Sequence, residues 1–185
     1  MPVYEPKDYE KVIERIQGKI ADMHIKMGKC LTEEEIVSFE NRHNVQLPQA
    51  YRMFLHHVGN GCKDMLDGFQ LKDLENCSLQ ELSAPFLLEK FWIWEDDERD
   101  ADLIEADMKN KVYRGNLELI NIGCGMSYNL IVTGKHRGEV WNFTDVGVQP
   151  CCEPQDFLGW FELWLDNQDE TDCFKDFVYD EADYD

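Results

Sequence analysis

The sequence predicts a single α+β domain in which an antiparallel β-sheet meander has helices packed on one face. Three observations predict it: two capped helices in the first half, β-rich runs separated by glycines in the second, and an aromatic helix after them. This order lacks the strand–helix–strand alternation of parallel sheets and is typical of α+β proteins. A chain of 185 residues, 43% of them hydrophobic, is long enough to bury a substantial core.

The first capped helix is expected to begin directly after Thr32. Thr32 is a good N-cap, and Glu35 three residues later completes a capping box, in which each side chain accepts a hydrogen bond from a backbone N–H that the helix leaves unpaired. Leu31 and Ile36 stand at the two positions of a hydrophobic staple. These signals together define the start of the helix.

The second helix is expected to open at Pro48, because a missing N–H costs nothing in the first turn of a helix. An apolar stripe follows at the i, i+3, i+4 and i+7 spacing of one helix face. The stripe consists of Tyr51, Phe54, Leu55 and Val58. Gly59 and Gly61 are expected to end the helix.

Two further segments flank the predicted domain of residues 31–166. An amphipathic helix is expected over residues 7–27, interrupted by Gly18 and closed by Gly28. We interpret residues 1–30 as an extension that packs on the domain, with docking to a partner as the alternative. Residues 167–185 are predicted to be a solvated acidic tail, with a short docked segment as the alternative. The apolar face of the N-terminal helix consists of Val12, Ile16, Ile20 and Met23.

The second half contains runs rich in β-forming residues, with glycines between them. The predicted strands are residues 116–123, 127–134 and 138–146, with another at 68–74. Residues 134–137 are expected to form a hairpin turn. A closing helix is expected over residues 156–166, where aromatic residues recur at helical spacing. These aromatic residues are Phe157, Trp160, Phe161 and Trp164.

The capped helices resemble the opening signature of the SUKH superfamily, known for cell-wall glucan-synthesis regulators and for bacterial immunity proteins against polymorphic toxins. The stretch that carries the resemblance is LTEEEIVSFENRHNVQLPQAYRMFLHHVGNG. Its family pattern is a capped acidic helix, a Leu-Pro step, an aromatic-rich helix and an Asn-Gly-Gly-like turn. The turn here reads Gly59-Asn60-Gly61, so its order is shifted and Cys62 takes the third position. A looser resemblance to the central strands and closing helix extends the match over residues 31–166.

The charge is strongly negative and unevenly placed. The chain has 38 acidic and 18 basic residues, a formal net charge of −20, whereas residues 1–30 carry five acids and six bases. Such a field repels nucleic acid and anionic membranes and accelerates encounters with basic proteins, with solubility alone as the alternative reading. No apolar run approaches the ~20 residues that span a bilayer. The N-terminal sequence lacks the layout of a signal peptide, so we expect a cytoplasmic protein.

The candidate binding site is an abrupt change from aromatic to acidic sequence. Eight acids and a single base, Arg99, stand between residues 95 and 107, which is typical of an exposed segment leaving the core. An aromatic anchor flanked by charge suits a protein interface, whereas a core tryptophan beside a surface glutamate is the alternative. The predicted partner-binding residues are Trp94, Glu95, Asp96, Asp97, Glu98, Asp100 and Asp102.

The residues able to perform chemistry form no recognisable catalytic site. The seven cysteines are odd in number and include no Cys-x-x-Cys pair, so we expect free, buried thiols. Cys124 between two glycines is the most suggestive, and a buried place at a strand bend is favoured over a nucleophile. His56 and His57 are adjacent, point about 100° apart on a helix and cannot share a metal as an i, i+4 pair could. One of them is expected to cap the helix C-terminus. We expect no catalytic residue, cofactor or metal.

The resemblance implies an immunity protein that binds and neutralises a cognate toxin. The charge agrees with a nuclease toxin, because nucleases hold phosphate on basic surfaces that attract an acidic partner. One alternative is an intracellular scaffold or regulatory protein that binds several partners. The other is an enzyme that uses Cys124 or the acidic cluster. The sequence leaves the oligomeric state open.

Overall fold

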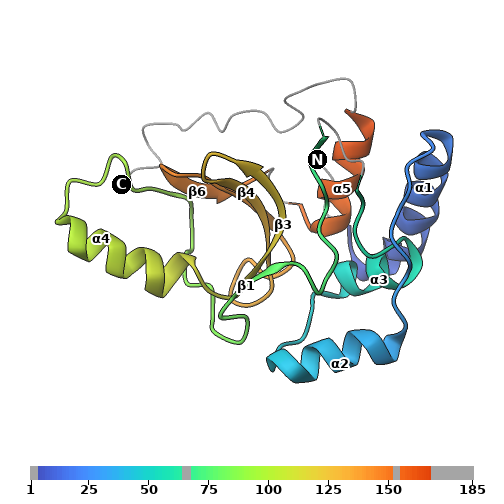
Figure 1. Cartoon of the computed structure of the whole chain (residues 1–185), viewed down its shortest axis with the longest axis horizontal. Coiled ribbons are helices and arrows are strands. Elements are labelled where there is room, and N and C mark those ends of the chain that lie inside the picture. The colour runs from blue at the N-terminus through green and yellow to red at the C-terminus, as the bar shows by residue number, and fades with distance from the viewer. Residues whose placement is uncertain (1–3, 64–67, 152–154, 168–185) are drawn as a thin grey trace.

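The structure, a computed structural model, describes residues 4–63, 68–151 and 155–167, so the predicted tail lies outside the described residues except for Asn167. Figure 1 shows the sheet between the helices near the two ends of the described chain on one side and the short helix of residues 101–107 on the other. This arrangement confirms the α+β fold class. The elements in chain order are η1 (Pro6–Asp8), α1 (Tyr9–Asp22), α2 (Glu33–His43), α3 (Gln49–His57), β1 (Ser78–Gln80), β2 (Trp92–Ile93), α4 (Ala101–Asp107), the π-helical η3 (Met108–Val112), β3 (Asn116–Gly123), β4 (Met126–Ile131), β5 (Val140–Phe143), β6 (Gly147–Pro150) and α5 (Phe157–Asp166).

The sheet has six antiparallel strands in the order β1-β3-β4-β5-β6-β2. The predicted meander is confirmed, and it has four consecutive strands because the run predicted at 138–146 ends at Phe143 and a turn leads into β6. The edge strands β1 and β2 were not predicted, since three and two residues are too few to show a periodicity. The strand predicted at 68–74 is wrong, because Leu71 forms only an isolated bridge with Cys62.

The capping box of α2 is confirmed. Thr32 Oγ1 accepts from the Glu35 N–H at 3.2 Å, and the Glu35 carboxylate accepts from the Thr32 N–H at 2.7 Å. The buried carboxylate of Glu40 then organises the turn into α3, because it accepts from the Leu47 N–H at 2.7 Å and from Arg52. The Leu-Pro step is therefore held by a side chain of the preceding helix.

The helix α3 begins one residue later than predicted. Pro48 is its N-cap, with a ψ of 138° outside the helical range, and Gln49 is its first residue. The predicted apolar stripe is buried, as expected. The turn after the helix requires a glycine at Gly61, which has a φ of +80° and whose added Cβ would lie 2.8 Å from the Asp73 nitrogen.

The N-terminal helix starts close to the predicted residue 7, with η1 leading directly into α1, but its predicted end at residue 27 is wrong. The helix α1 ends at Asp22, because His24 takes a left-handed φ of 57°. Gly28 is not a helix cap. Its N–H donates to the Gly61 carbonyl at 2.7 Å, and an added Cβ would lie 2.0 Å from the Asn60 carbonyl oxygen. A glycine is needed there because two backbone segments cross at close range.

Gly18 offers a direct test of helix propensity in α1. It is exposed, and an added Cβ would meet no atom within 4 Å. The Gly18→Ala substitution is therefore expected to raise the free energy of unfolding by about 0.5–1 kcal/mol, because alanine loses less backbone entropy in a helix interior. Urea denaturation measures this change. A lower midpoint for the variant would contradict the placement of Gly18 at an exposed, unobstructed position inside α1.

Apolar side chains form two clusters on the two faces of the sheet. Successive residues of a strand point to opposite faces. Accordingly, Leu130 of β4 belongs to the larger cluster and Ile131 to the smaller. The helices α1, α2, α3 and α5 cover the larger cluster, as predicted, and the smaller one includes Phe86, Leu88 and Trp94 from the segment that precedes α4. Ile104 and Met108 pack against the smaller cluster and so attach α4 to the sheet.

A buried carboxylate joins the first helix to the last. Glu162 of α5 is 5% exposed and accepts hydrogen bonds from Arg15, Lys19 and Tyr4. Burial alone raises the pKa of Glu162, but these three donors outweigh burial and lower it to about 2. The carboxylate therefore stays ionised and holds α1 against α5.

Candidate protein-binding surface

The acidic segment leaves the sheet at one edge. The strand β2 is outermost beside β6, and the chain runs from it through residues 94–100 into α4. Figure 1 shows α4 at the end of the molecule away from α1, α2 and α3. The sequence predicted an exposed segment without a helix. The helix forms because Asp100 Oδ1 accepts from the Asp102 N–H at 2.9 Å and caps its first turn.

Trp94 supports the acidic segment from beneath. It is 9% exposed, belongs to the smaller apolar cluster, and donates its indole N–H to the Asp145 carbonyl at 2.7 Å. Trp92 packs edge-on against it, with ring centroids 5.7 Å apart, and donates to Asp97 Oδ2 at 3.1 Å. The two rings fix where the segment departs from the sheet.

Asp97 is engaged within the segment itself. Arg99 donates to both oxygens of Asp97 and, at 2.9 Å, to Asp107, while its guanidinium lies 5.6 Å from the Trp92 ring centre. Hydrogen bonds from Arg99 hold the pKa of Asp97 well below its usual range, with smaller help from Trp92. Arg99, the single base among residues 95–107, therefore forms its ion pairs with two acids of the same segment.

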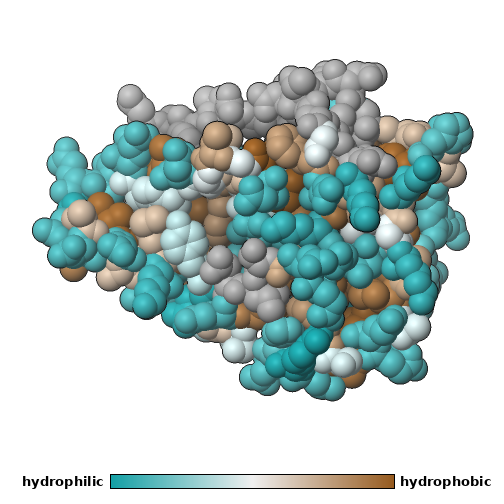
Figure 2. Space-filling model, in the orientation of Figure 1, coloured by the Kyte–Doolittle hydropathy of each residue, from teal (hydrophilic) through white to brown (hydrophobic). Residues whose placement is uncertain are grey.

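The other predicted acids face solvent. Within the described part of the chain they make no ion pair. Leu103 stands among them and is 58% exposed. Figure 2 shows hydrophilic side chains over this end of the molecule. We call this group the acidic surface; it consists of Glu95, Asp96, Glu98, Asp102 and Leu103.

Leu103 was missed by the sequence reasoning, although a signal for it exists. Leu103 and Ile104 are the adjacent apolar residues of α4, and neighbouring helical residues point about 100° apart. Ile104 packs against the smaller cluster, so Leu103 faces outward. Recognising the helix would have predicted one buried and one exposed residue.

A hollow of about 330 Å³ borders the acidic surface. Its wall combines the apolar residues Leu87, Leu88, Phe91 and Trp92 with charged residues, among them Asp107, which pairs with both Arg99 and Lys111. Leu87 in this wall is 50% exposed. An apolar hollow with a charged margin can receive an anchoring side chain of a protein partner.

Cys124 does not lie where the sequence placed it. Cys62, Cys77 and Cys151 are buried as expected, but Cys124 is exposed. It occupies the two-residue turn between β3 and β4 with a φ of +51°, and Gly125 follows with +80°. Positive φ at both positions is the signature of the type I′ hairpin turn, which displays its side chains at a strand end.

The histidines make contacts remote from that hairpin. His56 Nδ1 lies 2.9 Å from the Leu31 carbonyl, so it joins α3 to the start of α2 and does not cap its own helix. The last carbonyl of α3, that of His57, accepts from Gln17 at 2.7 Å. Across residues 4–63, 68–151 and 155–167, no three His, Cys, Asp or Glu side chains are grouped so as to hold a metal ion.

The fold and this surface define an α+β protein with an exposed acidic segment at one edge of its sheet. The chain belongs to the SMI1/KNR4 family (SUKH-1), whose family model matches residues 30–167. The match confirms the resemblance to the SUKH superfamily. Comparisons with curated proteins and with solved structures find no match. Among the helices of the described residues, none is long and apolar enough to cross a membrane.

Proposed function

We propose that this chain is a non-catalytic, cytoplasmic immunity protein that binds a cognate toxin with a basic surface and blocks it. The observation that carries the proposal is the acidic surface, where four exposed carboxylates without an ion-pair partner among the described residues and an exposed leucine stand close together in the chain. Solvated charges steer a basic partner into contact, and a central apolar side chain stabilises the complex once it forms. Membership of a SUKH family is consistent with this function.

The proposal also assigns separate roles to the predicted site residues: some contact the partner, and others hold the segment in place. Glu95, Asp96, Glu98 and Asp102 contact the partner, because they are exposed and unpaired among the described residues. Asp97, Asp100 and Trp94 position them, because their polar groups already bind Arg99, the α4 backbone and the Asp145 carbonyl. The basic active site of a nuclease is one surface whose charge would complement these acids.

The test is a growth experiment in a bacterial host. We expect a neighbouring gene to encode a large protein with a C-terminal toxin domain, and this domain is expressed with and without the chain. We expect the domain alone to stop growth and the chain to restore it. Growth that stays arrested despite a folded, expressed chain contradicts neutralisation. If the chain is instead a scaffold protein, it should bind several partners weakly and should not restore growth in the presence of the toxin domain.

Leu103 provides a second test at the level of the complex. Because its side chain is 58% exposed in the free chain, Leu103→Ala is expected to change the free energy of unfolding by less than about 0.5 kcal/mol. Loss of a central apolar contact is expected to speed dissociation from the toxin by about tenfold. Surface plasmon resonance measures the rate, and an unchanged rate removes Leu103 from the contact.

A further inference from the structure

The imidazole ring of His136, in the turn between β4 and β5, lies between two hydrogen-bond acceptors. Its Nδ1 is 3.1 and 3.0 Å from the two carboxylate oxygens of Glu139, and its Nε2 is 2.9 Å from the Glu89 carbonyl oxygen. A neutral imidazole has a single N–H, whereas both nitrogens of an imidazolium are donors. Both contacts are therefore hydrogen bonds only when the ring carries a positive charge.

The ring and its carboxylate partner are held in fixed orientations. His136 packs against the fully buried ring of Trp141, with ring centroids 4.9 Å apart. Trp141 also donates its indole N–H to Glu139 Oε2 at 2.9 Å. The carboxylate therefore stays beside Nδ1 and cannot turn away without losing the bond from the indole.

The other charged groups around the turn are directed to other partners. Lys135 Nζ lies 3.8 Å from the Glu89 carboxylate, and Arg137 donates to two backbone carbonyls that precede α3. The backbone of Asp156 bridges that of Glu139, but its carboxylate accepts from the α5 backbone. Among these charged side chains of the described chain, Glu139 is thus the one that contacts the ring.

The contact with Glu89 is the one that depends on protonation. A neutral ring keeps its proton on Nδ1, because a bare nitrogen there would face the negative charge of Glu139. The proton is then lost from Nε2, whose lone pair faces the carbonyl oxygen of Glu89 and is repelled by it.

Glu89 belongs to a segment of residues 84–91, which we call the strap. One end of the strap is tied by groups that do not titrate, because Thr133 Oγ1 donates to the Ala84 carbonyl at 2.7 Å and accepts from the Phe86 N–H at 3.1 Å. The bond from His136 to Glu89 is a second tie further along. Only this second tie changes with the charge of a histidine.

The strap forms part of the wall of the hollow beside the acidic surface. Leu87, Leu88 and Phe91 line this hollow. Between the two ties, Leu87 donates its N–H to the Lys111 carbonyl at 3.2 Å. Hydrogen exchange of the Leu87 amide therefore reports whether the strap stays in place.

We propose that His136 is a pH-dependent latch that fastens the strap to the turn between β4 and β5. Histidine side chains change charge between about pH 5 and 8. The latch is closed at the acidic end of this range, where both nitrogens donate, and it opens as the pH rises and Nε2 loses its proton. Opening loosens one wall of the hollow. The latch acts within the free chain, so it goes beyond the proposed toxin binding and does not depend on it.

Nuclear magnetic resonance of the full chain with isotope-labelled histidine tests the chemistry of the latch, because the chemical shifts of the ring nitrogens distinguish a bare nitrogen from a protonated one. We expect both nitrogens of His136 to be protonated at about pH 5, and Nε2 to be bare at about pH 8 while Nδ1 keeps its proton. A ring with one bare nitrogen at the lower pH, or with a protonated Nε2 at the higher pH, overturns the proposal.

Amide exchange of the same protein tests the mechanical consequence. The protection factor, which is the ratio of the intrinsic to the observed exchange rate, removes the chemical effect of pH on exchange. We expect the protection factor of the Leu87 amide to fall by about tenfold between the two conditions, as expected for the loss of one charge-assisted hydrogen bond. A constant value contradicts the latch.

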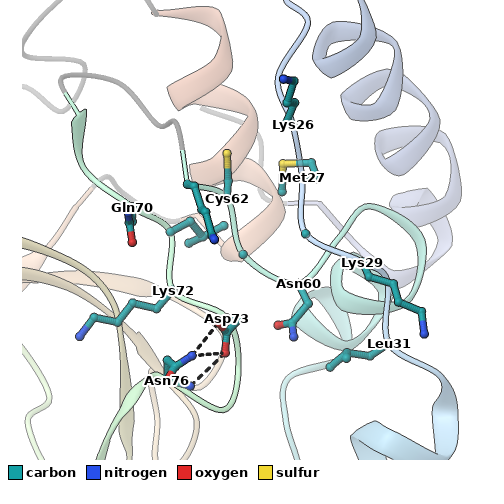
Figure 3. Close-up of a pocket in the computed structure, with 14 residues that line it drawn as sticks. Lys26, Met27, Lys29, Leu31, Asn60, Cys62, Gln70, Lys72, Asp73 and Asn76 are labelled. Carbon is teal, nitrogen blue, oxygen red and sulfur yellow. Dashed lines mark hydrogen bonds between the residues drawn. The ribbon is translucent and has the colours of Figure 1, made fainter.

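Residues 71–76 provide an internal reference. Leu74 donates its N–H to Asn60 Oδ1 at 2.8 Å, and the side-chain amide of Asn76 donates to the two oxygens of Asp73 at 3.0 and 2.7 Å (Figure 3). No histidine takes part in these bonds, so the protection factor of the Leu74 amide should stay constant. An equal fall for Leu74 and Leu87 would mean that the whole chain loosens, and would overturn the proposal.

Two variants complete the test. His136→Gln removes the titrating ring, so the protection factor of Leu87 should no longer depend on pH. His43→Gln is the matched control, because His43 is a half-buried histidine that packs against Phe39 on α2, with ring centroids 4.5 Å apart. It should keep the pH dependence of the unmodified chain. Loss of the dependence in both variants, or its persistence in His136→Gln, would show that another group controls the strap.

Discussion

Glu162→Gln is expected to lower the free energy of unfolding at pH 7 by about 2 kcal/mol. The substitution keeps the size of the side chain but removes the charge that Arg15, Lys19 and Tyr4 contact. The loss is smaller than for a fully enclosed ion pair, because the Arg15 and Lys19 side chains are 46% and 27% exposed and recover water. Urea denaturation of the two proteins measures the difference.

The difference in stability between the unmodified chain and Glu162→Gln is expected to depend on pH. Folding lowers the pKa of Glu162 from its ordinary 4.5 to about 2, so its contribution to stability is complete above about pH 5 and is lost as the pH falls toward 2. The stability difference between the unmodified chain and Glu162→Gln should therefore shrink across this range. Other acid effects are common to both proteins and cancel.

Tyr4→Phe is the matched control for the Glu162 prediction. It removes one of the three donors and leaves Arg15 and Lys19 in place, so it should cost less than Glu162→Gln. A difference between Glu162→Gln and the unmodified chain that stays constant from pH 7 to pH 3 would show that the carboxylate does not hold α1.

Neutralising the acidic surface is expected to slow association with the proposed toxin by about tenfold at low salt, because steering depends on charge near the contact. Only exposed acids without a partner among the described residues are changed, since altering Asp97 or Asp100 would also disturb the loop and the α4 cap. Stopped-flow mixing measures the rate, and the rates of the two proteins should converge as salt is added. The substitutions are Glu95→Gln, Asp96→Asn and Glu98→Gln.

A control variant separates the effect of charge at the acidic surface on the association rate from the effect of net charge. Three exposed acids of α1 are neutralised, which changes the net charge equally at the other end of the molecule. The control substitutions are Glu10→Gln, Glu14→Gln and Asp22→Asn. Equal slowing in both variants would mean that net charge, and not the acidic surface, guides the encounter.

The capped helices were predictable because their signals are local. The partners of a capping box are three residues apart, and the apolar stripe of α3 repeats within nine residues. The end of α1 was not predictable in this way. Gly28 is of the residue type that often caps a helix. The structure instead requires a glycine there because the backbone passes close to Asn60 and Gly61, which are more than thirty residues away in the sequence.

The candidate site was predictable in composition and not in arrangement. The run of acids correctly located an exposed segment, but its sequence did not reveal that Asp97 and Arg99 pair while Glu95 remains solvated. The helix α4 was hidden because a seven-residue element with one cap and few apolar residues shows little periodicity. Cys124 was misplaced because its exposure follows from hairpin register, which a single sequence does not display.

The central claim is that residues 95–107 form the contact with the toxin. Hydrogen–deuterium exchange of the chain, alone and in the complex, tests it most directly because each segment reports separately. We predict slower exchange on binding in residues 95–107, with little change in α1. Protection confined to other segments, with residues 95–107 exchanging as in the free chain, would contradict the claim.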